Sequence, residues 1–122
     1  KQAINNADIL TIAIGMDELA HIKITNQIKN EYLHDLEELS SMINLLNEKK
    51  VIIISLYTWK NNDFLTLEKL NASMRDIALT NNFIFIDINK ILMNKDYYLT
   101  TDSYYINYLG HKRIYEEIKK VL

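Results

Sequence analysis

Acidic and polar residues occur at the ends of three short apolar segments. Residues 15–18, which read Gly-Met-Asp-Glu, follow the first segment, Trp59 comes shortly after the second, and Asp87 lies in the third. In parallel sheets, ligands bind at the carboxyl ends of the strands. Residues 102–111 precede the last helical pattern, so we expect them near the same edge. The candidate site residues in these segments are Gly15, Met16, Asp17, Glu18, Trp59, Asp102, Tyr105 and Asn107.

Two readings of these side chains stay open. In the first reading, the carboxylates of Asp17, Glu18, Asp87 and Asp102 form a cluster at the sheet edge. In the other reading, Asp17 and Asp87 cap helices or brace turns, as short polar side chains commonly do. The loop aromatic residues likewise fit either the lining of a ligand cleft or its filling.

The numbers and positions of histidine, cysteine and glycine limit the kinds of functional site that the chain can form. His21, His34 and His111 are scattered without the spacing of a metal site, so we expect no metal. The chain contains no cysteine, which excludes thiolate zinc sites and cysteine nucleophiles. Its two glycines, Gly15 and Gly110, cannot form a glycine-rich phosphate-binding loop. We therefore expect no cofactor, and we expect His34 to be solvated and His111 to have a structural or surface role.

Three continuous apolar runs, rich in β-branched residues, predict the strands that position these residues. They cover residues 8–14, 51–57 and 83–88, and each run is too short to form a helix. Continuous apolar strands are typical of parallel sheets that are buried on both faces. We therefore expect all three strands, including the first, to be covered on both sides.

Apolar residues spaced by three or four positions predict helices between and after the strands. The stripes cover residues 24–46, 67–78 and 109–121, and Thr25 or Asn26 is placed to cap the first helix. The second helix is expected to end at the pair Asn81-Asn82. The predicted order is therefore β-α-β-α-β-α. This order is typical of a three-layer α/β/α sandwich with a parallel, flavodoxin-like sheet. The three strands are few for such an architecture, so we expect the chain to be an incomplete version of it.

Length and charge limit the function classes. With 122 residues and no internal repeat or linker, residues 1–122 are expected to form one domain. Fourteen basic residues against sixteen acidic ones make a nucleic-acid partner improbable on electrostatic grounds. No apolar run reaches the roughly 18 residues that a membrane span requires. The cellular compartment is left open by the absence of cysteine.

Four blocks of the sequence carry a family resemblance. Residues 9–18 form an apolar run that leads into Gly-Met-Asp-Glu, close to a strand that ends in Gly-x-Asn-Asp. Residues 70–78 match a helix with an early Asn and an Arg-x-x-Ala pattern, and residues 83–87 match a strand that ends in Asp. Residues 102–111 match a block before the final helix at its Asp, Asn, Gly and His positions. By these blocks the chain resembles the SGNH (GDSL-type) family of esterases and acylhydrolases over essentially its whole length, which implies the SGNH fold, represented by its C-terminal half to two-thirds.

The departures from the family's pattern affect its catalytic residues. The family's nucleophilic Ser and oxyanion-hole Gly belong to blocks that would precede Lys1. Asp17 stands at the position of the oxyanion Asn, where a carboxylate repels the developing negative charge. Tyr105 stands at the position of the catalytic His, and a phenol with a pKa near 10 is a poor base at neutral pH. Asp102 matches the triad acid but has no imidazole to orient.

The resemblance and its departures support two functions. The first is an SGNH-like domain that is catalytically inactive as this chain and binds a small ester, a carbohydrate or a protein. The alternative is a part of an active esterase or acyl transferase whose Ser lies on an upstream segment. In the family's strand order the first strand of this chain has an outer neighbour that would come from that segment. We therefore expect residues 9–14 to self-associate or to pair with an N-terminal fragment.

Overall fold

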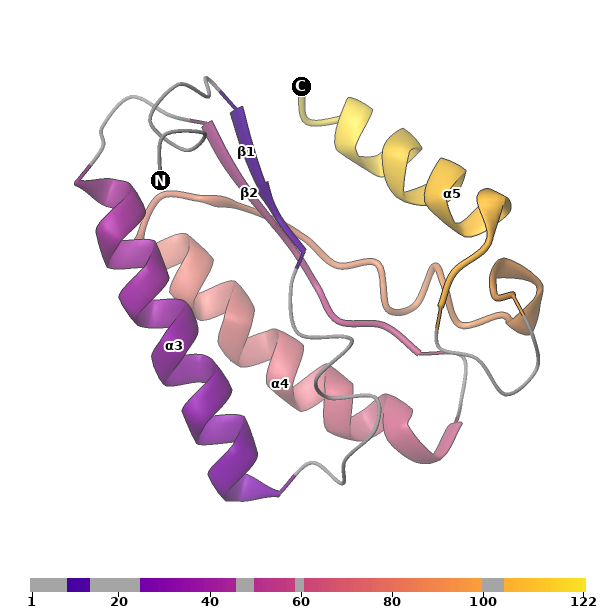
Figure 1. Ribbon diagram of the computed structural model, residues 1–122, viewed down its shortest axis with the longest axis horizontal. Helices are drawn as coiled ribbons and strands as arrows, with labels where there is room; N and C mark the ends of the chain where they lie inside the picture. The colour runs from indigo at the N-terminus through magenta and orange to yellow at the C-terminus, as the bar shows by residue number, and fades with distance from the viewer. Residues whose placement is uncertain (1–8, 14–24, 46–49, 59–60, 100–104) are drawn as a thin grey trace.

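The computed structural model describes residues 9–13, 25–45, 50–58, 61–99 and 105–122. Within these ranges the elements alternate between strands and helices, which confirms the predicted α/β order (Figure 1). The elements are β1 (Ile9–Ile12), α3 (Asn26–Asn44), β2 (Lys50–Ile54), α4 (Asn61–Thr80), β3 (Ile84–Ile86), the 3₁₀ helix η1 (Lys95–Tyr97) and α5 (Tyr108–Lys119).

The three strands form one parallel sheet in the order β1-β2-β3. Leu10 of β1 lies beside Val51 of β2, and Ile53 of β2 lies beside Phe85 of β3. Each strand is shorter than the apolar run that predicted it. The hydrogen bonding to the neighbouring strand ends before the apolar run does. The parallel sheet requires crossover connections, and α3 and α4 supply them.

Helices lie on both faces of this sheet, as the sequence predicts (Figure 1). The alternating side chains of β2 show the division: Val51 and Ile53 belong to the core shared with α3 and α4. Ile52 and Ile54 belong to a second core, which includes Ile114 on α5. The two cores therefore share β2 as their central strand, and each core depends on it.

The ends of α3 and α4 follow from local chemistry. Thr25 caps α3, because its side chain accepts a hydrogen bond from the backbone N–H of Ile28 at 3.2 Å. The chain leaves α4 through Asn82, whose φ of 59° lies in the left-handed region that asparagine tolerates. The predicted break at Asn81 and Asn82 is thus confirmed, and the short turn brings the chain directly into β3.

The expectation that the first strand is buried on both faces is wrong for the described part of the strand. Leu10 and Ile12 face the core that α3 and α4 cover, but Ile9, Thr11 and Ala13 are exposed. The register places Thr11 beside Ile52, on the α5 side of the sheet. Ile52 belongs to the core that α5 covers, whereas Thr11 does not. One face of β1 is therefore bare among the described residues.

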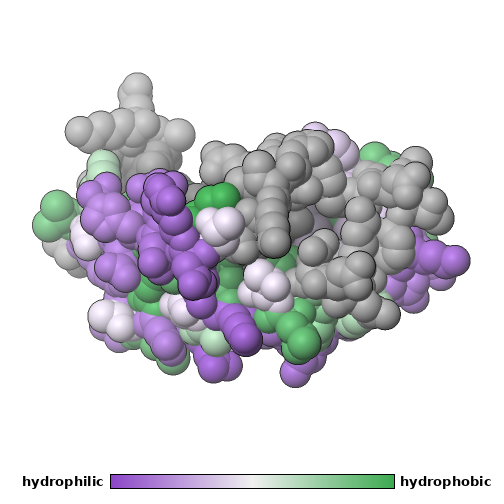
Figure 2. Space-filling view, turned by 90° about the horizontal axis from the view of Figure 1, so that it is seen from below, coloured by the Kyte–Doolittle hydropathy of each residue, from purple (hydrophilic) through white to green (hydrophobic). Residues whose placement is uncertain are grey.

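None of the helices in the described ranges is both long and apolar enough to cross a bilayer. Figure 2 shows hydrophilic residues interspersed with hydrophobic ones on the face of the molecule that is seen from below.

Candidate functional site

The carboxyl ends of β2 and β3 are joined by a buried serine. Ser55 follows β2, and its hydroxyl accepts a hydrogen bond from the backbone N–H of Ile88 at 2.8 Å. The same hydroxyl donates to Asp87 Oδ1 at a long 3.5 Å. Asp87 Oδ1 also accepts the backbone N–H of Asn89 at 3.1 Å, which closes a turn. Asp87 therefore braces a turn, which confirms the structural one of the two readings for this residue.

Two buried asparagines hold the loop after β2. Asn71 on α4 accepts from the backbone N–H of Leu56 and donates to its carbonyl, both at 2.9 Å. Asn89 accepts from the backbone N–H of Thr58 at 3.0 Å. This bond fixes the orientation of the Asn89 amide, because only its oxygen can accept. Asn89 Nδ2 is buried without a hydrogen-bond partner, so one donor at this edge is not used by the fold.

Asn107, a predicted binding residue, has a structural role in the described structure. Its Oδ1 accepts the backbone N–H of Gly110 at 3.1 Å and thereby caps α5. Its Nδ2 donates to the carbonyls of Asp96 at 2.8 Å and Tyr98 at 3.1 Å. Both donor hydrogens and one acceptor lone pair of the side chain are therefore committed to holding the start of α5 against the 95–98 segment.

Three tyrosines gather beside this capped turn. The Tyr98 hydroxyl donates to the carbonyl of Leu92 at 3.0 Å, and its ring lies 6.4 Å from the ring of Tyr57. Burial, with a smaller contribution from the nearby Tyr57, raises the pKa of the Tyr98 phenol well above its usual value. The carbonyl of Tyr105 accepts from the N–H of Leu99, and about half of Tyr105 is exposed. Tyr57 and Tyr105 thus present aromatic surface near the carboxyl edge.

The structure therefore brings together only part of the predicted site. Tyr105 and Asn107 lie on one short connection, next to the loops that follow β2 and β3. Six of the predicted residues lie outside the described residues: Gly15, Met16, Asp17, Glu18, Trp59 and Asp102. Ser55, Asn71 and Asn89 were not predicted. A polar residue that directly follows a run of buried β-branched residues, as Ser55 does, was the available signal.

The described histidines do not form a catalytic pair. Nε2 of His34 lies 3.1 Å from Glu38 on the exposed side of α3, which confirms that His34 is solvated. His111 is exposed on α5, and within the described ranges neither histidine hydrogen-bonds a serine. Among the same residues, no group of three or more histidine, aspartate or glutamate side chains could hold a metal ion.

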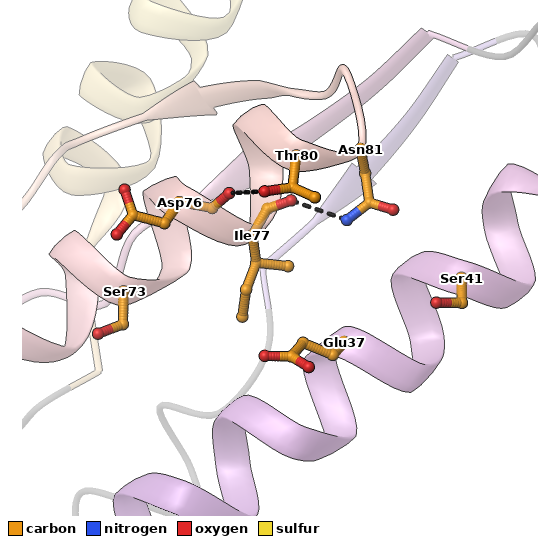
Figure 3. A pocket seen from close by; sticks show the side chains of 7 residues that line it. All are labelled: Glu37, Ser41, Ser73, Asp76, Ile77, Thr80 and Asn81. Carbon is orange, nitrogen blue, oxygen red and sulfur yellow. Dashed lines mark hydrogen bonds between the residues drawn. The ribbon is translucent and has the colours of Figure 1, made fainter.

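A separate pocket of about 400 Å³ lies between α3 and α4 (Figure 3). The hydroxyl of Thr80 and the amide of Asn81 donate to carbonyls of α4 itself, those of Asp76 and Ile77. The pocket lies along the end of α4 that leads into β3, away from the carboxyl edge of the sheet. Apart from Asn81, which directly follows α4, its lining residues come from α3 and α4, so the pocket is a surface groove between two packed helices. Its lining residues are Glu37, Ser41, Ser73, Asp76, Ile77, Thr80 and Asn81.

No family model, no curated protein and no solved structure matches this chain. The functional argument therefore depends on the residues and their geometry.

Proposed function

We propose that this chain is an SGNH-like domain that binds a small ester or a carbohydrate at the carboxyl edge of its sheet and does not hydrolyse it. The feature on which the proposal rests is Tyr105, which stands at the family's base position in the resemblance and is about half exposed. A phenol at this position provides contact area but no neutral-pH base.

The hydrogen bonds at this edge support binding in preference to turnover. The Ser55 hydroxyl, the one serine hydroxyl in the described loop 55–58 that follows β2, is buried and bonds to Ile88 and Asp87. It is therefore not an accessible nucleophile. Because the loops are fixed by buried bonds from Asn71 and Asn89, the edge is preorganised, which lowers the entropy lost on binding a ligand.

Aromatic surface supports an ester or carbohydrate as the ligand class. Ligand sites are lined mainly by apolar and aromatic side chains, with a few polar groups that orient the ligand. Tyr57 and Tyr105, which are both partly exposed, supply the aromatic part of such a lining. The charge of the chain is nearly balanced, which fits a neutral ligand.

Hydrolysis of p-nitrophenyl acetate tests the absence of turnover. We expect the folded chain to be no faster than a denatured control, and we expect no labelling by a serine-directed phosphonate. Turnover that the phosphonate abolishes would overturn the proposal and favour the alternative, an active esterase. The variant that combines Asp17→Asn with Tyr105→His should fold with stability close to that of the parent, because Asn has nearly the size of Asp and Tyr105 is about half exposed, where substitutions usually change the stability by less than about 0.5 kcal/mol.

The fluorescence of Trp59, the single tryptophan of the chain, provides a binding assay. We expect titration with an O-acetylated monosaccharide to change this fluorescence, and Tyr105→Ala to weaken the binding severalfold. Tyr108→Ala is the matched control, because Tyr108 is an exposed tyrosine on α5 that was not predicted as a site residue. If no change occurs with the parent chain, or if both variants bind alike, the carboxyl edge is not the site.

A further inference from the structure

The outer edge of β1 has the properties of a pairing surface. β1 is the first strand in the order β1-β2-β3, and in the described part of the chain no strand pairs with its other side. Its sequence, Ile-Leu-Thr-Ile, carries no charge and no proline. Natural edge strands are usually protected by such residues, by bulges or by a covering element. The unpaired backbone groups of β1 are thus open to pairing with another strand.

Apolar side chains extend this surface on the α5 side of the sheet. Ile9 is 47% exposed there. Tyr108 and Tyr115 are seven positions apart, so they lie on one side of α5, and Leu122 follows three residues after the helix ends. Tyr115 and Leu122 are about 60% exposed. Tyr115 comes one position after Ile114, which packs against the sheet. In a right-handed helix that runs antiparallel to the strands here, that position points toward the β1 side (Figure 1).

We propose that the occupant of this surface is a second copy of the same chain, paired antiparallel through β1. The pairing centred on Thr11 sets Leu10 opposite Ile12 of the other copy and Ile9 opposite Ala13. Residues opposite one another in an antiparallel pair lie on the same face. Leu10 and Ile12 would therefore join the two covered cores, and Ile9, Thr11 and Ala13 would form one strip on the other face. On each face of the sheet, apolar residues of β1 would therefore lie opposite apolar residues of the second copy.

The dimensions of the paired sheet fit the side chains available. The α5 helix packs on β2 and β3, so the two α5 helices would lie about four strand spacings, or about 19 Å, apart. Helices with their side chains are about 10 Å wide, which leaves a gap that Tyr115 and Leu122 from both copies fill. A stable interface buries about 800 Å² per partner. Five paired residues alone fall short of this area, and the exposed Ile9, Tyr115 and Leu122 supply much of the remainder.

Single cysteines test the register, because the chain has none of its own. Thr11→Cys places the two sulfur-bearing residues opposite each other, with Cα atoms about 5 Å apart, within the range of a disulfide. Ile9→Cys is the matched control on the same face, since its two copies would lie about 13 Å apart along the strands. We expect oxidation to cross-link the Thr11→Cys chain rapidly and the Ile9→Cys chain at least tenfold more slowly.

Solution mass tests the association itself. By sedimentation equilibrium at micromolar concentration we expect a dimer for the parent chain and a monomer for Thr11→Lys, which sets two ammonium groups face to face at the symmetry axis. Thr66→Lys, an exposed position on α4, should remain a dimer. A monomeric parent chain, a Thr11→Lys dimer or equal cross-linking rates would overturn the proposal. A monomer whose β1 amides are all protected from hydrogen exchange would identify another segment of the polypeptide as the occupant.

Discussion

Gly110 lies in the first turn of α5, where the helix approaches the segment that precedes it. A Cβ atom on Gly110 would lie 2.7 Å from the carbonyl oxygen of Tyr97 and 2.8 Å from Cβ of Ile106. Neither contact is with the flexible end of a side chain, so the backbone would have to move. The glycine at this position is thus required by close packing, and the same packing holds Tyr98 and Asn107 in place.

Gly110→Ala should destabilise the chain by up to about 2 kcal/mol. Overpacking costs about 1–3 kcal/mol, and the better helix propensity of alanine offsets about 1 kcal/mol of it. Urea unfolding measures the change. Lys112→Ala is the control, because Lys112 is exposed on the same helix and its removal should change the free energy of unfolding by less than about 0.5 kcal/mol. A stabilised Gly110→Ala chain would mean that the turn adjusts freely.

Among the helices, α4 contributes a buried polar residue to the core in addition to its apolar face. Its stripe of Leu67, Leu70, Met74 and Ala78 packs on the sheet, as its spacing predicts. Asn71 belongs to the same buried side, although its residue type is polar. Since both of its hydrogen bonds go to Leu56, it joins the middle of α4 to the loop after β2 and so supports the candidate site.

Asn71→Leu should destabilise the chain by about 2–6 kcal/mol, although leucine has the same branched shape and is a better helix former. The reason is that the N–H and C=O of Leu56 would be buried without partners, and each unsatisfied group costs about 1–3 kcal/mol. Thermal and urea unfolding would measure the loss. In Ser73→Ala, two residues further along α4, only a long 3.5 Å bond to the carbonyl of Lys69 is removed, so little change is expected. Equal effects of the two substitutions would argue against the proposed role of Asn71.

At the scale of the whole molecule, both cores depend on β2. Ile52 and Ile53 are adjacent and fully buried, one in each core. The α5 layer and the α3–α4 layer therefore both pack on β2. We infer that the described part of the chain unfolds as one cooperative unit, with the α5 layer and the α3–α4 layer separating from the sheet together.

Ile52→Val and Ile53→Val test this inference. Each should lower the free energy of unfolding by about 0.5–1.5 kcal/mol, because each removes one buried methylene group from a packed core. In both variants, far-UV circular dichroism and tyrosine fluorescence should report the same midpoint. If one variant shifts only one of the two signals, the layers unfold separately and the inference fails.

The order and type of the elements could be predicted from local sequence patterns. Runs of β-branched residues located β1, β2 and β3, and apolar spacing located α3, α4 and α5. The sequence also indicated Thr25 as a helix cap and the asparagine pair at the end of α4. These features depend on side chains within a few positions of one another, so a local pattern is enough to predict them.

Which polar residues hydrogen-bond to one another became clear only from the folded chain. The hydroxyl of Ser55 bonds to an N–H that is 33 positions later, and Asn71 bonds to a residue 15 positions earlier. The bare face of β1 likewise depends on where α5 packs, because the apolar composition of a strand does not say which of its faces a distant helix covers. Contacts of this kind arise from the approach of distant segments, and no local pattern records them.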